Sequence, residues 1–309
     1  MKNSPTGRCA QSLATMGPQS PKPEPRQLRR QRQCFEQGRG TGSGPDYLPF
    51  LQVERAGFQS RGRSHLVFND SLGRQHHLLS DLELLNFLWA WSLKPIDLRE
   101  QFPLQVYEFD PLFSFREQPS KGSLEIAKAL GFRHPHITKS EPRVMTTDLL
   151  VSFADGTHLA IHAKYMKDLE NSPERALELR RIEKRYWLDR GVRFVIADEQ
   201  PFTERLADLM MWAIDGMKWD GDSACLEAIL AILDSTLVHQ PLGERLSHCS
   251  SRLGMSSQIV TRAFKHAILT RQWRPLQLEQ ELDLSCVWPG RRTRGQAVAT
   301  ARNFRRPHR

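Results

Sequence analysis

The feature of this sequence that most constrains its fold is a pair of strand-like runs joined by a tight turn. Residues 144–153 are rich in the apolar and β-branched side chains that strands favour, and residues 159–164 alternate apolar with polar positions. Between them, Asp155-Gly156 is a strong hairpin turn signal. We therefore predict an antiparallel hairpin over residues 144–164.

A helix and a further strand are predicted after the hairpin. Ser172 is the expected cap of the helix, Pro173 its first residue, and Gly191 lies just past its end. Residues 192–197 (Val-Arg-Phe-Val-Ile-Ala) have the composition of a buried strand. The order strand, strand, helix, strand predicts an α/β core.

The segment before the hairpin supplies one more helix and one more strand. Apolar residues recur at three- and four-residue spacing until Pro95 closes the run, which predicts a helix with Leu82, Leu85, Leu88 and Trp89 on one face. Residues 97–104 are predicted to form a short strand, and residues 47–67 strands or loops that cover the core. Residues 105–141 are expected to be an irregular, polar surface insertion.

The length and the change of pattern along the chain predict four regions. Residues 1–44, rich in Gln, Pro, Arg and Gly, are expected to form no element longer than a turn and to be a disordered basic tail. Residues 45–200 hold the α/β domain, residues 201–289 a mainly helical domain, and residues 290–309 a second basic tail. The domain boundary is expected near residue 200, where strands give way to helices.

The positive charge of the chain is concentrated in the two tails. The net charge is +9, yet residues 45–289 hold 29 basic and 33 acidic groups, so the excess comes from the tails. Basic tails without apolar periodicity can neutralise phosphates without reading a base sequence. We expect a nucleic-acid partner, with a tail that only keeps the protein in solution as the alternative.

Two other classes of protein are disfavoured. No run of about 18 apolar residues is present, so we expect no membrane span. The N-terminal residues lack the apolar core of a secretory signal. The five cysteines, an odd number without metal-ligand spacing, are expected to be reduced thiols of a cytoplasmic protein.

The predicted hairpin carries residues that suit metal-dependent hydrolysis of a phosphodiester. That reaction needs a metal to shield the phosphate and activate a water, with a base or cation nearby. Asp148 lies on the first strand, His162-Ala163-Lys164 end the second, and Glu83 in the preceding helix completes a pair of carboxylates. Carboxylate and carbonyl oxygens are the ligands that Mg²⁺ prefers.

Each of these residues also has a structural interpretation. Ser80 and Glu83 fit a capping box, in which Glu83 accepts from the Ser80 amide. Asp148 suits a turn at the end of a strand, His162 an outward-facing position, and Lys164 a solvated edge charge. Residue types and spacing leave both interpretations open.

The length of the hairpin loop bears on that choice. Asp148, His162 and Lys164 must lie on one face of the sheet to act together. A two-residue turn at Asp155-Gly156 would pair residue 148 with residue 163 and turn Lys164 to the other face. The catalytic interpretation therefore predicts a loop of odd length or a bulge at Gly156.

The region after residue 200 has the outline of a winged-helix DNA-binding motif. Residues 246–253, Gly254 and residues 256–270 are predicted to form a helix, a turn and a second helix, with a wing over residues 273–288. The second helix is expected to bury Ile259, Ala263 and Ile268 and to expose the candidate phosphate contacts Arg262, Lys265 and His266.

Several blocks of sequence follow one another in a recognisable order. They are residues 38–42 (Gly-Arg-Gly-Thr-Gly), Asp46-Tyr47, 62–65 (Gly-Arg-Ser-His), 76–84 (His-His-Leu-Leu-Ser-Asp-Leu-Glu-Leu), 98–104 (Leu-Arg-Glu-Gln-Phe-Pro-Leu), Thr147-Asp148, the strand ending in Lys164, and Arg185-Tyr186-Trp187. Together they resemble the TnsA family, the endonuclease subunits of Tn-seven-type heteromeric transposases. The resemblance covers residues 38–198 well and the C-terminal region more loosely.

The resemblance implies a restriction-endonuclease-like fold, a mixed sheet with flanking helices, and roles for particular residues. Glu83 and Asp148 match the metal-binding acids of the family, Lys164 matches its catalytic lysine, and the backbone carbonyl of Ala163 is a further candidate ligand. His162 stands where relatives usually have Gln. A ring nitrogen is a poorer ligand for Mg²⁺ than an oxygen, which puts a catalytic role of His162 as a metal ligand in doubt.

Two further sets of residues lie near this candidate site. Glu183, in the helix after the hairpin, matches an acid of the family, with a solvated helix face as the alternative. His76-His77, close to Glu83, suggests zinc, but the sequence has no Cys or His partners at useful spacing, so we do not predict a zinc site.

The resemblance also implies a reaction, partners and a location. TnsA-type subunits hydrolyse phosphodiesters at the 5′ ends of a transposon with Mg²⁺ (Mn²⁺ is the other candidate), on double-stranded transposon-end DNA. An RNase-H-like, TnsB-like transposase cuts and joins the 3′ ends, and an AAA+ ATPase (TnsC-like) regulates both. The implied location is the cytoplasm of a prokaryote, at the nucleoid during activity, and the C-terminal region is an alternative docking site for the ATPase.

Two other functions compete with this one. The first is a free-standing restriction- or repair-type nuclease, and the second a catalytically inactive DNA-binding scaffold, which the histidine at position 162 suggests.

Overall fold

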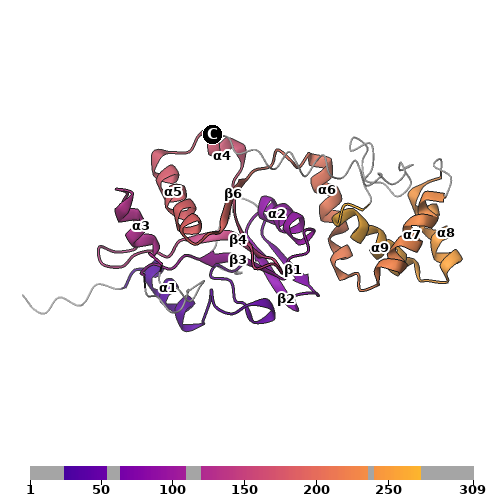
Figure 1. Cartoon of the computed structure of the whole chain (residues 1–309), viewed down its shortest axis with the longest axis horizontal. Helices are drawn as coiled ribbons and strands as arrows, with labels where there is room; N and C mark the ends of the chain where they lie inside the picture. The colour runs from indigo at the N-terminus through magenta and orange to yellow at the C-terminus, as the bar shows by residue number, and fades with distance from the viewer. Residues whose placement is uncertain (1–23, 54–62, 109–119, 236–239, 273–309) are drawn as a thin grey trace, which may run out of the picture.

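A four-stranded mixed sheet forms the centre of the molecule. The computed structural model describes residues 24–53, 63–108, 120–235 and 240–272, and Figure 1 shows the sheet between helices. The pairs β3/β4 and β4/β5 are antiparallel, and β5 and β6 pair parallel. The spatial order is β3 (Asp97–Pro103), β4 (Thr146–Ser152), β5 (His158–Ala163), β6 (Arg193–Ala197). The predicted α/β core with a mixed sheet is confirmed.

The loop between β4 and β5 has the odd length that the catalytic interpretation requires. Ser152 pairs with His158, and the Phe153 amide donates to the Thr157 carbonyl, which leaves residues 154–156 as a three-residue loop. Gly156 has a φ of +77°, the left-handed conformation expected of glycine in such a loop.

The register of this hairpin fixes which side chains share a face. Leu149 pairs with Ile161, so the next positions outward, Asp148 and His162, lie opposite each other. Strand alternation then gives Lys164, two residues further on, the same side as His162. Asp148, His162 and Lys164 therefore share one face of the sheet, as the catalytic interpretation requires.

Helices cover both faces of the sheet. On one face, α2 (Asp81–Trp91) packs over strand residues Leu149, Val151, Leu159 and Ile161. On the other face, α5 (Glu174–Asp189) and α3 (Ser123–Ala129) pack with Leu150 and Ala160 in a second cluster. The predicted helix with its Ser80 cap is confirmed, because the Ser80 hydroxyl accepts from the Glu83 amide.

A small antiparallel hairpin precedes α2. It consists of β1 (His65–Asn69) and β2 (Arg74–Leu78), next to the short helix η1 (Gly44–Asp46). β1 overlaps the range expected to hold strands or loops, whereas β2 was not predicted. The polar residues of β2 are buried in a network with β3, which conceals the strand pattern in the sequence.

The prediction that residues 1–44 contain no element is wrong for part of that range. Helix α1 (Arg26–Glu36) consists largely of Arg, Gln and Leu, which are good helix formers. Tertiary contacts hold it in place: the Gln31 side chain donates to the Pro142 carbonyl and accepts from the Val144 amide. Its buried residues are Leu28 and Cys34.

Two further predictions about local structure are wrong. The segment 105–141 contains α3, whose Ile126 and Ala127 are buried, so this part is core and not a polar insertion. Ser172 does not cap α5, because its hydroxyl donates to the Asp168 carbonyl. Pro173 takes the cap position without a side-chain hydrogen bond, and Gly191 follows the end of the helix as expected, with a φ of +65°.

The chain after residue 200 is helical wherever the structure describes it. Gly254 is left-handed at the end of α8, so the predicted helix, turn and helix are confirmed. Residues 273–288, the predicted wing, lie outside the described residues. The elements are α6 (Glu204–Trp212), η2 (Ala213–Lys218), α7 (Ser223–Ser235), α8 (Leu242–Leu253) and α9 (Ser257–Leu269), and a short helix α4 (Met166–Glu170) precedes α5.

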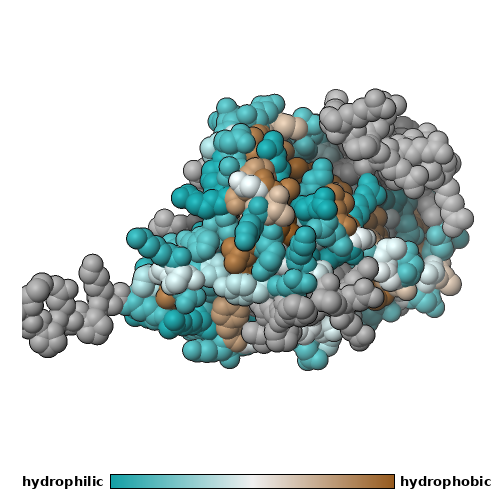
Figure 2. Space-filling model, turned by 60° about the vertical axis from the view of Figure 1, so that its left-hand side comes forward, coloured by the Kyte–Doolittle hydropathy of each residue, from teal (hydrophilic) through white to brown (hydrophobic). Residues whose placement is uncertain are grey.

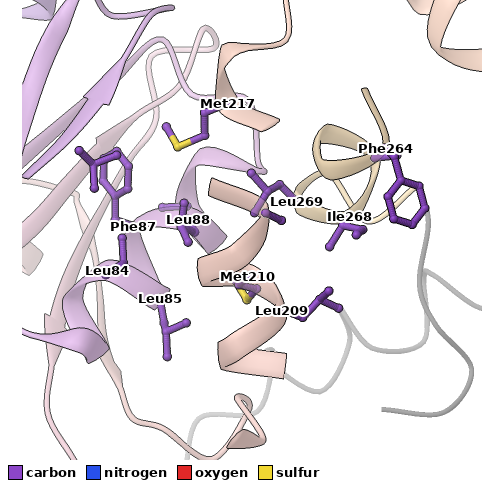
Figure 3. Close-up of a cluster of buried hydrophobic side chains, with 14 of the residues drawn as sticks. Leu84, Leu85, Phe87, Leu88, Leu209, Met210, Met217, Phe264, Ile268 and Leu269 are labelled. Atoms are coloured by element: carbon purple, nitrogen blue, oxygen red, sulfur yellow. The ribbon is translucent and has the colours of Figure 1, made fainter. Parts of the chain in front are cut away.

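One apolar core joins the sheet to these C-terminal helices. Figure 3 shows side chains of α2, α6, η2 and α9 meeting in a single cluster, which includes Leu85, Leu88, Met210, Met217 and Ile268. The edge of the Trp91 ring lies against His266, with ring centroids 5.6 Å apart. The start of the helical region near residue 200 thus marks a change of secondary structure within a continuous core.

Three features of the described residues concern membrane helices, the polarity of the surface and free thiols. Among the described residues, no helix is long and apolar enough to cross a membrane. The face in Figure 2 is mostly hydrophilic, with apolar side chains showing between hydrophilic ones. Cys225 and Cys249 are thiols without a disulfide partner.

Candidate active site

Glu83 lies in the first turn of α2, where three groups contact its carboxylate. Oε2 accepts from the Leu79 amide at 2.9 Å and from Gln101 Nε2 at 3.2 Å, and the Ser80 hydroxyl lies 3.5 Å from Oε1. The expected capping box is present only in part, because the carboxylate accepts from the Leu79 amide and not from the Ser80 amide. This position leaves Glu83 in contact with β3.

Asp148 is the third residue of β4 and faces the end of β5. Its Oδ2 accepts a hydrogen bond from the Ala163 amide at 2.7 Å, and its Oδ1 lies 3.5 Å from Gln101 Nε2. The alternative of a turn residue at a strand end is therefore wrong. Asp148 takes the place of a backbone partner for the Ala163 amide, and so it fixes the peptide group between His162 and Ala163.

Lys164 follows β5 directly and is held through its backbone. Its amide donates to the Ala197 carbonyl at 2.9 Å, which extends the pairing with β6 by one residue. Its ammonium lies 3.2 Å from the Asp168 carboxylate in α4, and the side chain is 41% exposed. A half-exposed ammonium can reach an approaching anion without a large desolvation cost.

Gln101, which the sequence did not single out, lies between the two carboxylates. The same Nε2 atom contacts Glu83 and Asp148, and the Thr146 hydroxyl donates to Gln101 Oε1 at 3.1 Å. The only signal for Gln101 in the sequence was its place in the block of residues 98–104, which resembles the TnsA family. The structure thus brings Glu83 and Asp148 together around one amide group.

The partly buried His162 and the buried Glu183 form a pair next to Asp148. His162 Nδ1 lies 3.0 Å from Glu183 Oε2 and 3.7 Å from Asp148 Oδ2. Glu183 is buried and accepts from the Thr147 hydroxyl at 2.8 Å, and Trp187 Nε1 donates to the same hydroxyl oxygen at 2.6 Å. The alternatives of an outward-facing His162 and a solvated Glu183 are therefore wrong.

The carboxylates of the site have raised pKa values. Burial, and then the charge of Asp148, raise the pKa of Glu83 to about 8. Burial also raises the pKa of Asp148, an effect that Glu183 reinforces and His162 opposes. Burial lowers the pKa of His162, but Glu183 and Asp148 outweigh it and raise that pKa to about 9. The two carboxylates thus favour the protonated form of the His162 ring, which is a poor metal ligand.

The residues present fit one divalent ion such as Mg²⁺. Within the described residues, no three His, Cys, Asp or Glu side chains are grouped as a metal cluster. Mg²⁺ does not need one, because it is commonly held by one or two carboxylates together with waters. Glu83 and Asp148 supply two partly buried carboxylates that repel each other when both are ionised, and a cation between them would relieve that repulsion.

The neighbouring histidines do not form a zinc site. His76 Nδ1 lies 2.8 Å from Glu100 Oε2, whereas His77 Nδ1 accepts from the Val53 amide at 3.0 Å. The two rings thus have separate partners. Glu100 is fully buried and also accepts from both terminal nitrogens of Arg74.

The candidate phosphate contacts of α9 are half-buried against the rest of the protein. Arg262 lies 3.5 Å from the Asp215 carboxylate, Lys265 lies over the Trp212 ring, and His266 Nδ1 lies 3.0 Å from the Gly216 carbonyl. The expectation that this face is exposed is wrong, as is the expected burial of Ile259, which is 39% exposed. These contacts therefore do not support a DNA-binding role of Arg262, Lys265 and His266.

A groove lined by apolar residues, glutamines and arginines is linked to the carboxylates through Thr146 and Gln101. It has a volume of about 450 Å³ and includes Thr146, whose hydroxyl contacts Gln101. Its described lining contains four glutamines and three arginines (Arg30, Arg39, Arg143) but no Asp or Glu. Donor-rich walls of this kind suit an anionic ligand such as a phosphate.

The arrangement defines the class of the protein. A mixed sheet whose central hairpin presents an aspartate and the peptide before a lysine, beside a glutamate from a helix, is a restriction-endonuclease-like core. Residues 111–199 match the family of the TnsA-like endonuclease N-terminal domain. The chain is 36% identical over 181 residues to transposon Tn7 transposition protein TnsA of Escherichia coli. Residues 111–199 are thus similar to the N-terminal domain of TnsA-like endonucleases.

The extent of this similarity is limited. The aligned residues make up 58% of this chain and 59% of the E. coli protein. The chain thus spans about three fifths of the length of the relative that it matches.

Proposed function

We propose that this protein is a transposon-end endonuclease, which hydrolyses phosphodiesters at the 5′ ends of a transposon during cut-and-paste transposition. The observation that carries the proposal is the placement of Glu83 and Asp148 on either side of Gln101 Nε2, next to the end of β5. The similarity to a protein named for Tn7 transposition supports this reaction over other uses of the same fold.

Glu83, Asp148 and the Ala163 carbonyl would hold Mg²⁺, with Mn²⁺ as a substitute. The bound ion would shield the scissile phosphate and lower the pKa of a water. Lys164 would orient the attacking water and offset the negative charge that develops on the phosphate. Its contact with Asp168 is half-exposed, and a phosphate at the site would compete with it.

His162 has a different role from that of a metal ligand in this proposal. Its protonated ring lies between Glu183 and Asp148 and offsets part of their negative charge. Glu183, held by the Thr147 hydroxyl, keeps the ring in place. His162 and Glu183 thereby support the position of Asp148.

The substrate of the proposed reaction is double-stranded DNA. The groove that contains Thr146 has Arg and Gln in its lining and is linked to the carboxylates through Gln101, so the DNA backbone would lie along it. The net positive charge outside residues 45–289 would add attraction that does not depend on base sequence.

The proposed partners follow from the division of labour in TnsA-type systems. An RNase-H-like transposase would cut and join the 3′ ends, and an AAA+ ATPase would regulate both enzymes, in the cytoplasm of a prokaryote. Because the candidate DNA contacts of α9 are engaged within the molecule, we favour docking of the ATPase over DNA binding for the C-terminal helices.

A nicking assay tests the proposal. End-labelled transposon-end DNA is incubated with the full chain, Mg²⁺ and the partner transposase, and cleavage at the 5′ end is measured. We expect cleavage by the wild type, loss of cleavage in Asp148→Ala, and no loss in the control Asp189→Ala, which changes an exposed aspartate.

Other outcomes would favour the competing functions. Cleavage without the transposase would indicate a free-standing nuclease. Binding of the DNA without cleavage in any combination would indicate an inactive scaffold, and cleavage by Asp148→Ala would remove the site assignment.

A further inference from the structure

Gln101 has a backbone conformation that its residue type disfavours. It is 2% exposed and has a φ of +48°, in the left-handed region where a Cβ atom is crowded. Glycine is the residue that adopts this conformation without that cost. A glutamine at such a position, in the middle of a strand, indicates that the side chain is needed there.

The left-handed residue changes which face the strand presents. Leu98 belongs to the cluster on the α2 side of the sheet, whereas Phe102 and Leu104 belong to the cluster on the α5 side. Regular alternation would place all three on one face. The reversal falls at Gln101, opposite Asp148, where the paired positions of β3 and β4 are interrupted.

This reversal places the Gln101 amide between residues from opposite sides of the sheet. Glu83 comes from α2 on one side, and Asp148 lies beside His162 and Glu183 on the side of α5. The Thr146 hydroxyl donates to Gln101 Oε1 and thereby turns Nε2 toward both carboxylates. The donor is therefore oriented by a second hydrogen bond.

We infer that Gln101 is a positioning residue, whose side-chain amide sets the separation of the Glu83 and Asp148 carboxylates for a divalent ion. The inference rests on the proposed function, because it assumes that these carboxylates bind the ion. Groups that orient metal ligands without touching the metal commonly change its affinity or the activity by about 10- to 100-fold.

The substitution Gln101→Asn tests the role of the side chain separately from that of the backbone conformation. Asparagine tolerates the left-handed conformation, but it is one methylene shorter and cannot contact both carboxylates. Gln101→Gly is the second variant, because it removes the amide and also the backbone cost. The control Lys94→Asn introduces the same residue at another left-handed position, with φ +57°, where the side chain is exposed.

Binding of Mn²⁺ to the full chain is measured by electron paramagnetic resonance, alongside nicking and thermal melting. We expect Gln101→Asn and Gln101→Gly to bind Mn²⁺ about tenfold more weakly and to nick correspondingly more slowly, with melting within a few degrees of wild type. Lys94→Asn should bind Mn²⁺ as the wild type does.

The outcomes distinguish this inference from the proposed function. If wild type binds Mn²⁺ and Asp148→Ala does not, while both Gln101 variants bind as wild type does, the positioning role is wrong and the proposed site stands. If the wild type binds no Mn²⁺, or if Asp148→Ala binds Mn²⁺ as well as the wild type does, both the positioning role and the proposed function are wrong.

Discussion

Two glutamates close to the same strand, Glu100 and the partly buried Glu83, behave in opposite ways. Glu100 is fully buried, and Arg74, His76 and the His77 amide all donate to its carboxylate. Glu83 has only neutral donors, the Leu79 amide among them, and its nearest charged neighbour is another carboxylate. The charge of Glu100 is neutralised by cationic groups within the fold, whereas the charge of Glu83 is not.

The pKa values follow from this difference. Burial raises the pKa of Glu100, but His76 and Arg74 outweigh burial and bring it to about 2. Burial and Asp148 raise the pKa of Glu83 to about 8. Glu100, which is paired with cations inside the fold, contributes to stability. Glu83, which lies beside a second acid, is suited to bind a cation from outside the chain.

The largest expected effect is on cleavage. Glu83→Gln removes one of the two carboxylates and should slow nicking of transposon-end DNA by roughly a thousandfold, since a metal contributes several kcal/mol to this chemistry. Circular dichroism should show an unchanged fold. Glu174→Gln, at an exposed glutamate in the first turn of α5, is the matched control and should cut normally. Full activity of Glu83→Gln would contradict the distinction between the two glutamates.

The second effect is on folding. Glu100→Gln leaves the Arg74 charge buried without its counter-ion, and breaking a buried pair in this way costs about 3–5 kcal/mol. Urea denaturation should show that loss in the free energy of unfolding. A stability equal to that of the wild type would mean that the Glu100 network is not structural.

The third effect comes from the ion itself. Mn²⁺ at about 100 times its dissociation constant should stabilise the wild type by about 2.7 kcal/mol. The melting temperature should then rise by roughly 5–10 °C, given about 2–4 °C per kcal/mol for a chain of this size. The shift should vanish in Glu83→Gln. An equal shift in that variant would place the ion elsewhere.

The smallest effect is the pH dependence of stability without divalent ions. The folded pKa of Glu83 lies above its ordinary value of 4.5, so its contribution is present below pH 4.5 and is lost as pH rises toward 8. Glu83→Gln should therefore melt a few degrees above wild type at pH 9 and similarly at pH 5. The folded pKa of Glu100 lies below 4.5, so its contribution is lost as pH falls from there toward 2. Parallel melting curves of wild type and Glu83→Gln would contradict this account.

Local pattern was sufficient to predict the hairpin, the strands β3 and β6, and the helices α2 and α5, but it missed α3. The condition on the loop could be stated in advance, because the two-residue period of a strand links loop length to the face that Asp148 and Lys164 occupy. Glu83 was a candidate from its place in the helix before the hairpin, but Ser80 and Glu83 also fit a helix cap, and the family resemblance then favoured a metal-binding role. Its carboxylate does retain the capping role in part.

The contacts that the sequence did not predict are long-range. The bridge made by Gln101 depends on a left-handed residue inside a strand, which no periodicity signals. The partnership of His162 with Glu183 joins a strand to a helix packed across it. In α9, periodicity separated an apolar from a polar face, but it could not show that η2 and α6 cover the polar one.

The most direct test of the site is a crystal soaked with Mn²⁺, with anomalous scattering used to locate the ion. We predict an anomalous peak between Glu83 and Asp148, within about 2.2 Å of an oxygen of each carboxylate, because hard divalent ions bind oxygen at such distances. The result that would contradict the account is Mn²⁺ bound elsewhere in the molecule while these two carboxylates hold none.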